Sequence, residues 1–309
     1  MSDLSRLQMR DAFIERLFER AKEDRDILFI ANDFGAPSLD RFRAELPGQY
    51  INAGIAEQNI ISVAAGLAMA GKKVFVYSIA SFITLRCLEQ IKLDLCCHQL
   101  PVTILGVGAC YAYPEDGPTH HASEDISIMR SLVGLSLYSP ADAQTAQELV
   151  DVALEQNAPS YIRLDKVAGI TLGPGQDGLR VFGSGQDFCL LATGVMVHRA
   201  LEVAQRLRDA GHGVTVVDLY RLKPLNSAAL LALLPAFKRL VTLEEHTIHG
   251  GLGSVIAEFV VDHRLSLPLQ RLAIADDHLY GYGSRSRLHQ LAGLDCDSIE
   301  TAIRDWGEQ

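Results

Sequence analysis

The sequence predicts an α/β protein of two domains, each with a mainly parallel sheet flanked by helices. Two observations lead to this prediction. Short, continuously apolar segments such as residues 27–31 and 102–107 alternate with longer segments of helical periodicity. Strands of that kind, placed between helices, are typical of parallel sheets covered on both faces. A glycine-rich stretch at residues 169–185 then separates two such alternating series.

The first series predicts a domain over residues 1–168. After an N-terminal amphipathic helix, its expected strands are residues 27–31, 74–77, 102–107, 135–138 and 160–164, and its expected helices are residues 56–70, 82–98, 123–132 and 142–156. The helix over 56–70 is expected to end at Gly71, because glycine readily adopts the left-handed conformation that closes a helix. Its small, apolar composition predicts burial on all sides and close packing, including on a symmetry mate.

Residues 169–186 are expected to form a linker, and residues 187–309 a second, smaller α/β domain. The expected strands of this domain are residues 188–192, 214–217, 240–243 and 269–274, and its expected helices are residues 195–210 and 253–261. A chain of 309 residues is long enough for two domains of ordinary size.

Composition excludes several kinds of partner. The net charge is −10 and no long Lys/Arg cluster is present, which argues against nucleic acid or an anionic membrane as the main partner. No apolar run approaches the roughly 20 residues of a membrane-spanning helix, and the first residues lack the pattern of a signal peptide. The six cysteines contain no CxxC pair, which favours reduced thiols in a cytoplasmic protein.

Glu57 is the first candidate for chemistry. It lies at the expected start of the helix over 56–70, where the helix dipole favours a negative charge. One interpretation is an ordinary first-turn carboxylate. The other is a desolvated carboxylate used in proton transfer, because the helix that follows is almost wholly apolar.

A polar loop between an expected strand and helix supplies the second set of candidates. Asp116 and the adjacent His120 and His121 lie around a Gly-Pro pair that restricts the backbone. Three interpretations stay open at this point. The loop is an acid/base relay, a metal site built from Asp116, His120 and Glu124, or a structural loop with exposed imidazoles.

Two further features also allow two interpretations each. Phe82, at the end of an expected strand, is either a core residue or a platform on which a heteroaromatic ring stacks. The glycine-rich residues 249–254 are either a tight helix entry or an anion site.

Taken in chain order, these motifs resemble the C-terminal half of transketolase, as found in split enzymes of two subunits. The matching segments are residues 54–59, Phe82, residues 115–120, 139–142, 159–163, 192–194, 223–224 and 244–253. The resemblance therefore covers nearly the whole chain. It implies a pyrimidine-binding domain of the thiamine diphosphate-binding fold, followed by the transketolase C-terminal domain, which mainly supports dimerisation.

The resemblance also implies roles for individual residues. Glu57 hydrogen-bonds the aminopyrimidine of thiamine diphosphate, Phe82 stacks on that ring, and Asp33 belongs to the same cofactor-binding set. The cofactor performs the carbon–carbon chemistry, while the protein activates and orients it. Asp116 and His120 contact the sugar hydroxyls of the substrate and help to move protons during ketol transfer.

Substrate recognition departs from the family pattern at several positions. Gly108 replaces a histidine that transketolases use on the acceptor phosphate, and His121 is not the usual neighbour of His120, so it can read a different substrate. The remaining candidates for phosphate contact are Arg10, Ser38, Arg163 and Lys166. A lysine binds phosphate as a point charge, whereas an arginine binds it through two parallel N–H groups. The expected substrate is therefore either a sugar or a sugar phosphate.

The diphosphate half of the site is absent from this sequence. Family enzymes hold Mg²⁺ and the diphosphate with a Gly-Asp-Gly motif, which does not occur here. The resemblance therefore implies a partner subunit that carries the metal ligands, self-association, and a two-plus-two heterotetramer. The alternatives are a subunit of the 2-oxo acid dehydrogenase beta type, a deoxyxylulose-phosphate-synthase-like enzyme, and a non-enzymatic scaffold.

Overall fold

The computed structural model of the protein describes residues 7–33, 35–168, 171–280 and 283–308. The parts of the expected domains and linker that fall on residues 1–6, 34, 169–170, 281–282 and 309 lie outside the described residues. The chain forms two compact units. The first unit comprises Met1–Ala109 and Ile128–Pro174, and the second comprises Cys110–Ser127 and Gly175–Gln309. Each contains a mainly parallel sheet flanked by helices, which confirms the predicted fold class.

Parallel strands form the sheet of the first unit, in the order β5-β6-β4-β3-β1-β2. These strands are β1 (Ile27–Ala31), β2 (Tyr50–Asn52), β3 (Lys73–Ile79), β4 (Val102–Val107), β5 (Ser136–Tyr138) and β6 (Ser160–Leu164). Every residue of β1, β4 and β6 is buried, as expected for continuous apolar strands covered on both faces. The carboxyl ends of β1, β3 and β4 lead directly into the segments that carry candidate site residues.

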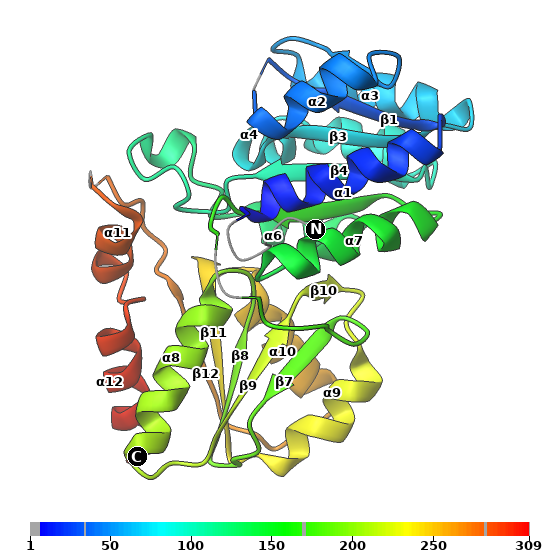
Figure 1. The fold of residues 1–309 in the computed structure, drawn as a ribbon. Coiled ribbons are helices and arrows are strands. Elements are labelled where there is room, and N and C mark those ends of the chain that lie inside the picture. The colour runs from blue at the N-terminus through cyan, green and yellow to red at the C-terminus, as the bar shows by residue number, and fades with distance from the viewer. Residues whose placement is uncertain (1–6, 34, 169–170, 281–282, 309) are drawn as a thin grey trace. The chain divides into compact units, whose positions relative to one another are not determined.

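The helices of the first unit are α1 (Met9–Glu23), α2 (Pro37–Glu45), α3 (Glu57–Met69), α4 (Ala80–Leu85), α5 (Leu88–Gln90), the π-helical η2 (Ile91–Cys96) and α7 (Ala143–Glu155). The helix α6 (Asp125–Ser131) begins in the second unit and ends in the first. Figure 1 shows α1 and α7 side by side, and Arg16 and Arg20 both bond to Asp151 between them. A single helix over 82–98 is a wrong prediction, because α4, α5 and η2 divide that segment.

The expectation that α3 is buried on all sides is also wrong for the single chain. One face, formed by Ile60, Ile61 and Ala64, is buried against the sheet. The opposite face is open: Val63 is 40% exposed and Met69 is 60% exposed. An apolar helix with one bare face has further burial to gain from another chain.

The second unit contains a five-stranded sheet in the order β12-β11-β8-β9-β7. Its strands are β7 (Leu179–Phe182), β8 (Phe188–Ala192), β9 (Val214–Leu219), β11 (Arg239–Thr247) and β12 (Leu269–Ile274), and the short β10 (Arg221–Lys223) lies outside this sheet. Strand β7 runs antiparallel to β9 and lies within the stretch expected to be a linker. Gly178 and Gly183 flank it with positive φ values, so its ends have the composition of a loop although the strand is paired.

Helices cover both faces of this second sheet, with α8 in front and α10 behind in Figure 1. They are α8 (Met196–Asp209), α9 (Ser227–Leu233), the 3₁₀ turn η4 (Leu234–Ala236), α10 (Leu252–Asp262), α11 (Arg285–Leu291) and α12 (Cys296–Gly307). The segment Cys110–Ser127, with its 3₁₀ turn η3 (Gly117–Thr119), groups with this unit although it follows β4 in sequence. This grouping was not predicted, and it attaches the polar loop to the second unit.

Candidate functional site

Glu57 begins α3, as the sequence predicted. A turn precedes it in which Gly54 adopts a φ of +67° and its N–H bonds to Oδ1 of Asn52 at 3.0 Å. Glu57 itself is only 5% exposed, so its carboxylate has lost most of its hydration. A buried carboxylate at the first turn of a helix is stabilised by the helix dipole and needs further polar partners.

Arg86 supplies one such partner. Its Nη1 donates to Oε2 of Glu57 at 2.7 Å, and the arginine side chain itself is 46% exposed. Within the described residues, Oε1 of Glu57 accepts no hydrogen bond. The carboxylate is therefore held through one oxygen, and the other has no hydrogen-bond partner among the described residues.

The same guanidinium lies over Phe82. The Cζ atom of Arg86 is 4.6 Å from the centroid of the Phe82 ring, a cation–π distance. One planar, N–H-donating group thus both bonds Glu57 and covers an aromatic ring. Arg86 and Phe82 are four residues apart, at the spacing that brings side chains together on a helical segment. The sequence interpretation missed Arg86, although this spacing from Phe82 was a signal for it.

Cys87 follows Arg86 and is buried beside the carboxylate. Its thiol donates to the carbonyl oxygen of Phe82 at 3.7 Å. Burial, reinforced by the charge of Glu57, raises the pKa of the Cys87 thiol to about 12. The thiol therefore stays protonated at neutral pH and has no nucleophilic role.

The end of β1 adds a residue that the sequence interpretation did not select. Asn32 is buried, and neither atom of its side-chain amide has a hydrogen-bond partner within the described residues. The adjacent Asp33 is exposed. Burying an amide without hydrogen-bond partners costs free energy, and a ligand or a water molecule often supplies the missing partners. The carboxyl end of β1 therefore carries two polar groups, one of them incomplete.

Arg10 and Ser38 are brought together by Asp11. The guanidinium of Arg10 bonds the Asp11 carboxylate at 3.0 and 3.1 Å, and Ser38 donates to the same carboxylate at 2.8 Å. Arg10 is only 7% exposed; burial acts against its charge, but the hydrogen bonds to Asp11 and the nearby Tyr77 leave its pKa raised. The pair predicted to contact phosphate thus has an internal counter-ion in this structure.

Arg163 and Lys166 lie at and just after the end of β6. Arg163 is 3% exposed, whereas Lys166 is half-buried. Between them, the buried carboxylate of Asp165 accepts the backbone N–H groups of Lys166 and Val167 at 2.7 and 3.1 Å. Of these two cations, Lys166 is the one more accessible from solvent.

Asp116 and His120 lie on the polar loop of the second unit. Asp116 is exposed and His120 is half-buried. Gly117 has a φ of +70° and its carbonyl accepts the N–H of His120 at 3.0 Å, which closes the 3₁₀ turn between them. The hydroxyl of Thr119 lies 2.9 Å from Nδ1 of His120 and fixes that edge of the ring. One short turn thus presents a carboxylate and an oriented imidazole together.

His121 behaves differently from its neighbour. It is buried, with its ring in an edge-to-face contact with Tyr111 at 4.9 Å between centroids. Burial lowers the pKa of His121, and its Nε2 has no hydrogen-bond partner within the described residues. The two adjacent imidazoles thus face different surroundings.

Other kinds of site find little support. Among the described residues, no three His, Cys, Asp or Glu side chains gather as a metal-ligand set, so the alternative metal site at Asp116, His120 and Glu124 gains no support. The helices of the described segments include none with the length and apolarity needed to cross a membrane.

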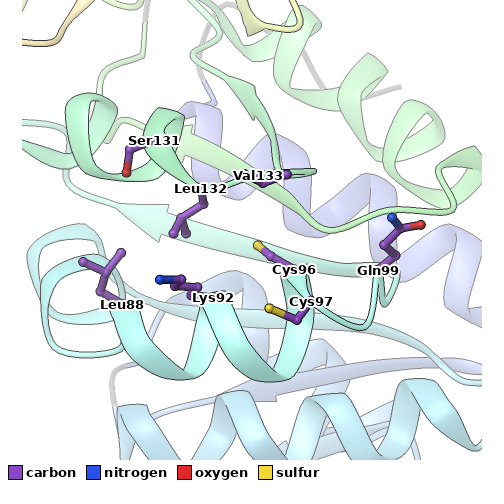
Figure 2. A pocket seen from close by; sticks show the side chains of 8 residues that line it. All are labelled: Leu88, Lys92, Cys96, Cys97, Gln99, Ser131, Leu132 and Val133. Carbon is purple, nitrogen blue, oxygen red and sulfur yellow. The ribbon is translucent and has the colours of Figure 1, made fainter.

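One cavity of about 580 Å³ lies in the first unit (Figure 2). It is lined by Leu88, Lys92, Cys96, Cys97, Gln99, Ser131, Leu132 and Val133. None of these is a predicted site residue, and the polar groups of the lining do not converge on one point in Figure 2.

Comparisons with known proteins identify the class to which this fold and these motifs belong. A family model described as "Transketolase, pyrimidine binding domain" matches residues 5–169, and "Transketolase, C-terminal domain" matches residues 179–299. The fold is thus the one shared by the pyrimidine-binding and C-terminal domains of transketolases. The chain belongs to the transketolase family and corresponds to the C-terminal-type subunit of its split members.

Individual relatives agree with this assignment. The chain is 34% identical over 302 residues to one of the subunits of an apulose-4-phosphate transketolase from Phocaeicola vulgatus, covering 95% of this chain and 96% of that protein. It is 33% identical to a 6-deoxy-6-sulfo-D-fructose transketolase subunit of a Clostridium species, covering 97% and 95%. A solved structure described as a split gene transketolase, inactive beta4 tetramer, matches with 31% identity, a TM-score of 0.85, and 97% and 98% coverage.

Proposed function

We propose that this chain is the small subunit of a split, thiamine diphosphate-dependent transketolase in the cytoplasm. It transfers a two-carbon ketol unit from a ketose donor to an aldose acceptor. The observation that carries the proposal is Glu57: a buried carboxylate at a helix start, held through one oxygen only. That arrangement fits an acid that must hydrogen-bond a bound heteroaromatic ring.

The residues of the first unit fit the aminopyrimidine end of the cofactor. Glu57 has an oxygen available for a ring nitrogen, Phe82 offers an aromatic platform beside it, and Asn32 has a buried amide in need of partners. Asp33 stays a predicted member of this set. When bound, the cofactor supplies a stabilised carbanion for breaking and forming carbon–carbon bonds. The role of Glu57 is to hold and exchange a proton at the pyrimidine ring.

We assign substrate binding to the polar loop and to Lys166. We assign Asp116 and His120 to the sugar hydroxyls, because one is exposed and the other half-buried on the same short turn. We assign a phosphate or another anion of the substrate to Lys166, because it is more accessible from solvent than Arg163. Arg10 and Arg163 stay predictions for this role; both are buried, and Asp11 already pairs with Arg10.

A partner subunit completes the proposed enzyme. This sequence contains no Gly-Asp-Gly motif, and Mg²⁺ with a diphosphate requires several oxygen ligands. We therefore place Mg²⁺ and the diphosphate on a second, N-terminal-type subunit in a two-plus-two heterotetramer. The open face of α3, with Val63 and Met69 exposed, is the surface we assign to self-association between copies of this chain.

The test is reconstitution. The chain is mixed with a subunit that carries a Gly-Asp-Gly motif, thiamine diphosphate and Mg²⁺, and ketol transfer is assayed with ketoses and aldoses, with and without phosphate. We expect activity only from the mixture. Activity from this chain alone would overturn the split-subunit proposal. Oxidative decarboxylation of a 2-oxo acid, or pyruvate condensation, would instead favour the dehydrogenase-type or synthase-type alternative.

A further inference from the structure

The motif at residues 244–253 has a use that neither cofactor nor substrate binding explains. Glu244 accepts the backbone N–H groups of Leu252 and Gly253 at 2.6 and 2.7 Å. The start of α10 is therefore already occupied by a carboxylate of the same chain. A Cβ at Gly251 would lie 2.0 Å from Oε2 of Glu244, which explains the glycine. The helix-entry interpretation of this segment is supported, and the anion site is filled internally.

Glu245 is the next residue of β11, and its partners come from α11. It is buried, and Arg285 binds both of its oxygens, with Nε at 2.8 Å from Oε1. His289 also donates from Nε2 to Oε1 of Glu245. Because Arg199 lies 3.3 Å from Nδ1 of His289 and has only donors to offer, the proton of this ring is on Nε2. Each member of the cluster is thereby fixed in orientation.

Beyond His289, the cluster reaches the polar loop. The ring of Tyr111 lies 6.3 Å from that of His289 and 4.9 Å from that of His121, measured between centroids. Tyr111 and His121 are both buried, and His121 immediately follows the half-buried His120. A continuous series of packed rings therefore runs from the ion-paired Glu245 to the residue next to His120.

The same strand also holds the far end of the loop. Nε2 of His246 accepts the N–H of Ser127 at 3.3 Å, and the N–H of Thr247 donates to the carbonyl of Ser123 at 2.9 Å. The loop is consequently attached to the second unit at Tyr111 and His121 on one side and at Ser123 and Ser127 on the other. The turn that carries Asp116 and His120 lies between Tyr111 and His121 in the sequence.

We propose that Glu245, His289 and Tyr111 are positioning residues that set the orientation of the substrate loop by bracing His121. Satisfied buried networks of this kind rigidify what they contact. The second unit thereby gains a part in substrate recognition. The inference rests on the proposed function only in assigning sugar contacts to Asp116 and His120; the brace itself is independent of the reaction.

The first test follows amide hydrogen exchange of the full-length chain by mass spectrometry. His289→Phe keeps an aromatic ring beside Tyr111 but removes the N–H that bonds Glu245. We expect exchange over residues 111–121 to quicken about tenfold, while the sheet of the second unit keeps its protection. His289→Gln retains an amide donor and should restore much of the protection. The control is His212→Phe, another ring-packed histidine of this unit, at Phe188.

The second test uses the two-subunit enzyme with D-xylulose 5-phosphate as the donor. His289→Phe should raise the KM for the sugar about tenfold, with the dissociation constant for thiamine diphosphate unchanged. Unchanged exchange over 111–121, or equal loosening of the whole second unit, would overturn the brace. Failure of the wild-type mixture to transfer ketol units from any of the ketoses tested would overturn the proposed function instead, and the exchange result would still decide the brace.

Discussion

Two buried glutamates, one in each unit, have opposite hydrogen-bonding situations. Glu57 and Glu245 are 5% and 2% exposed, so both have lost nearly all contact with water. Glu245 is completed by Arg285 and His289 of its own unit. Glu57 has one bond, from the half-exposed Arg86, and one oxygen without a partner in the described residues.

The difference shows that burial of a carboxylate does not by itself mark a reactive site. A charge that is fully paired inside the chain stabilises a fixed arrangement. A charge that is desolvated but only partly paired is ready for a group supplied from outside. By this criterion we assign ligand binding to Glu57 and a structural role to Glu245, a distinction that substitution of each residue can test.

The largest effect is expected from Glu57→Gln. The amide retains the shape of the side chain but cannot exchange a proton with a bound pyrimidine. Ketol transfer by the reconstituted enzyme should fall by about 10³-fold, the range that positioned acid–base groups contribute. Urea denaturation followed by circular dichroism should show little change in the stability of the chain.

The matched control for Glu57→Gln is Glu89→Gln, an exposed residue of α5 in the same unit. It should keep wild-type activity. Full activity in the Glu57 variant would remove the proposed role of this carboxylate, and equal losses in both variants would point to a disturbed subunit interface instead.

Glu245→Gln should have the opposite effect to Glu57→Gln, because its main consequence is a lower stability of the second unit. The change removes the buried counter-ion of the half-buried Arg285 guanidinium, and removing one partner of a buried pair costs about 3 kcal/mol. Trp306, the single tryptophan of the chain, lies on α12 of the second unit, so its fluorescence reports unfolding of that unit. Glu202→Gln, which removes a half-exposed pair with Arg206, should cost less than about 1 kcal/mol.

The pH dependence of stability provides a second readout of the same variant. Burial favours a higher pKa for Glu245, but Arg285 and His289 outweigh burial and lower the pKa to about 2, from an ordinary value of 4.5. A depressed pKa contributes stability that is complete above pH 4.5 and is lost as the pH falls toward 2. The Trp306-monitored free energy of unfolding should therefore fall more steeply across this window in the wild type than in Glu245→Gln.

Hydrophobic patterning predicted the central strands because burial on both faces leaves a direct signature in sequence. Strands β1, β4, β6 and β8 lie inside their sheets and begin and end at the predicted residues. The edge strand β12 also has the predicted bounds, although most of its residues are only half-buried. Strand β7 has no such signature: its outer positions are partly exposed and glycines flank it, so only pairing with β9 defines it. The break of the helix after Leu85 likewise depends on packing that composition does not encode.

For the site, the sequence predicted positions better than partners. The placement of Glu57 at a helix start is confirmed, since strand-to-helix junctions can be located from periodicity. The contact of His289 with Glu245 joins residues 44 positions apart, and that of Tyr111 with His289 joins more distant ones still. No local pattern records such contacts. The burial of His121 beside the half-buried His120 depends on such contacts, so the sequence could not predict it either.

The smallest effect is expected from Arg86→Met, which keeps the length of the side chain but removes its N–H donors. Because Arg86 orients Glu57 through one charge-assisted bond, thiamine diphosphate should bind to the two-subunit complex up to about tenfold more weakly. Stability should change by less than about 1 kcal/mol, since the arginine is half-exposed. Calorimetric titration with the cofactor, in the presence of Mg²⁺, measures the first quantity and urea denaturation the second.

The outcome for Arg86→Met refines the contrast between the two glutamates. Lys92→Met, an exposed cation on η2, is the control and should leave cofactor binding unchanged. Tighter binding in Arg86→Met would mean that the guanidinium occupies the place of the pyrimidine over Phe82 and must be displaced. A loss of stability near 3 kcal/mol would mean that Glu57 is paired as completely as Glu245, since that is about the cost of breaking a fully buried pair. Weaker binding at constant stability is the combination that a half-paired, ligand-binding carboxylate requires.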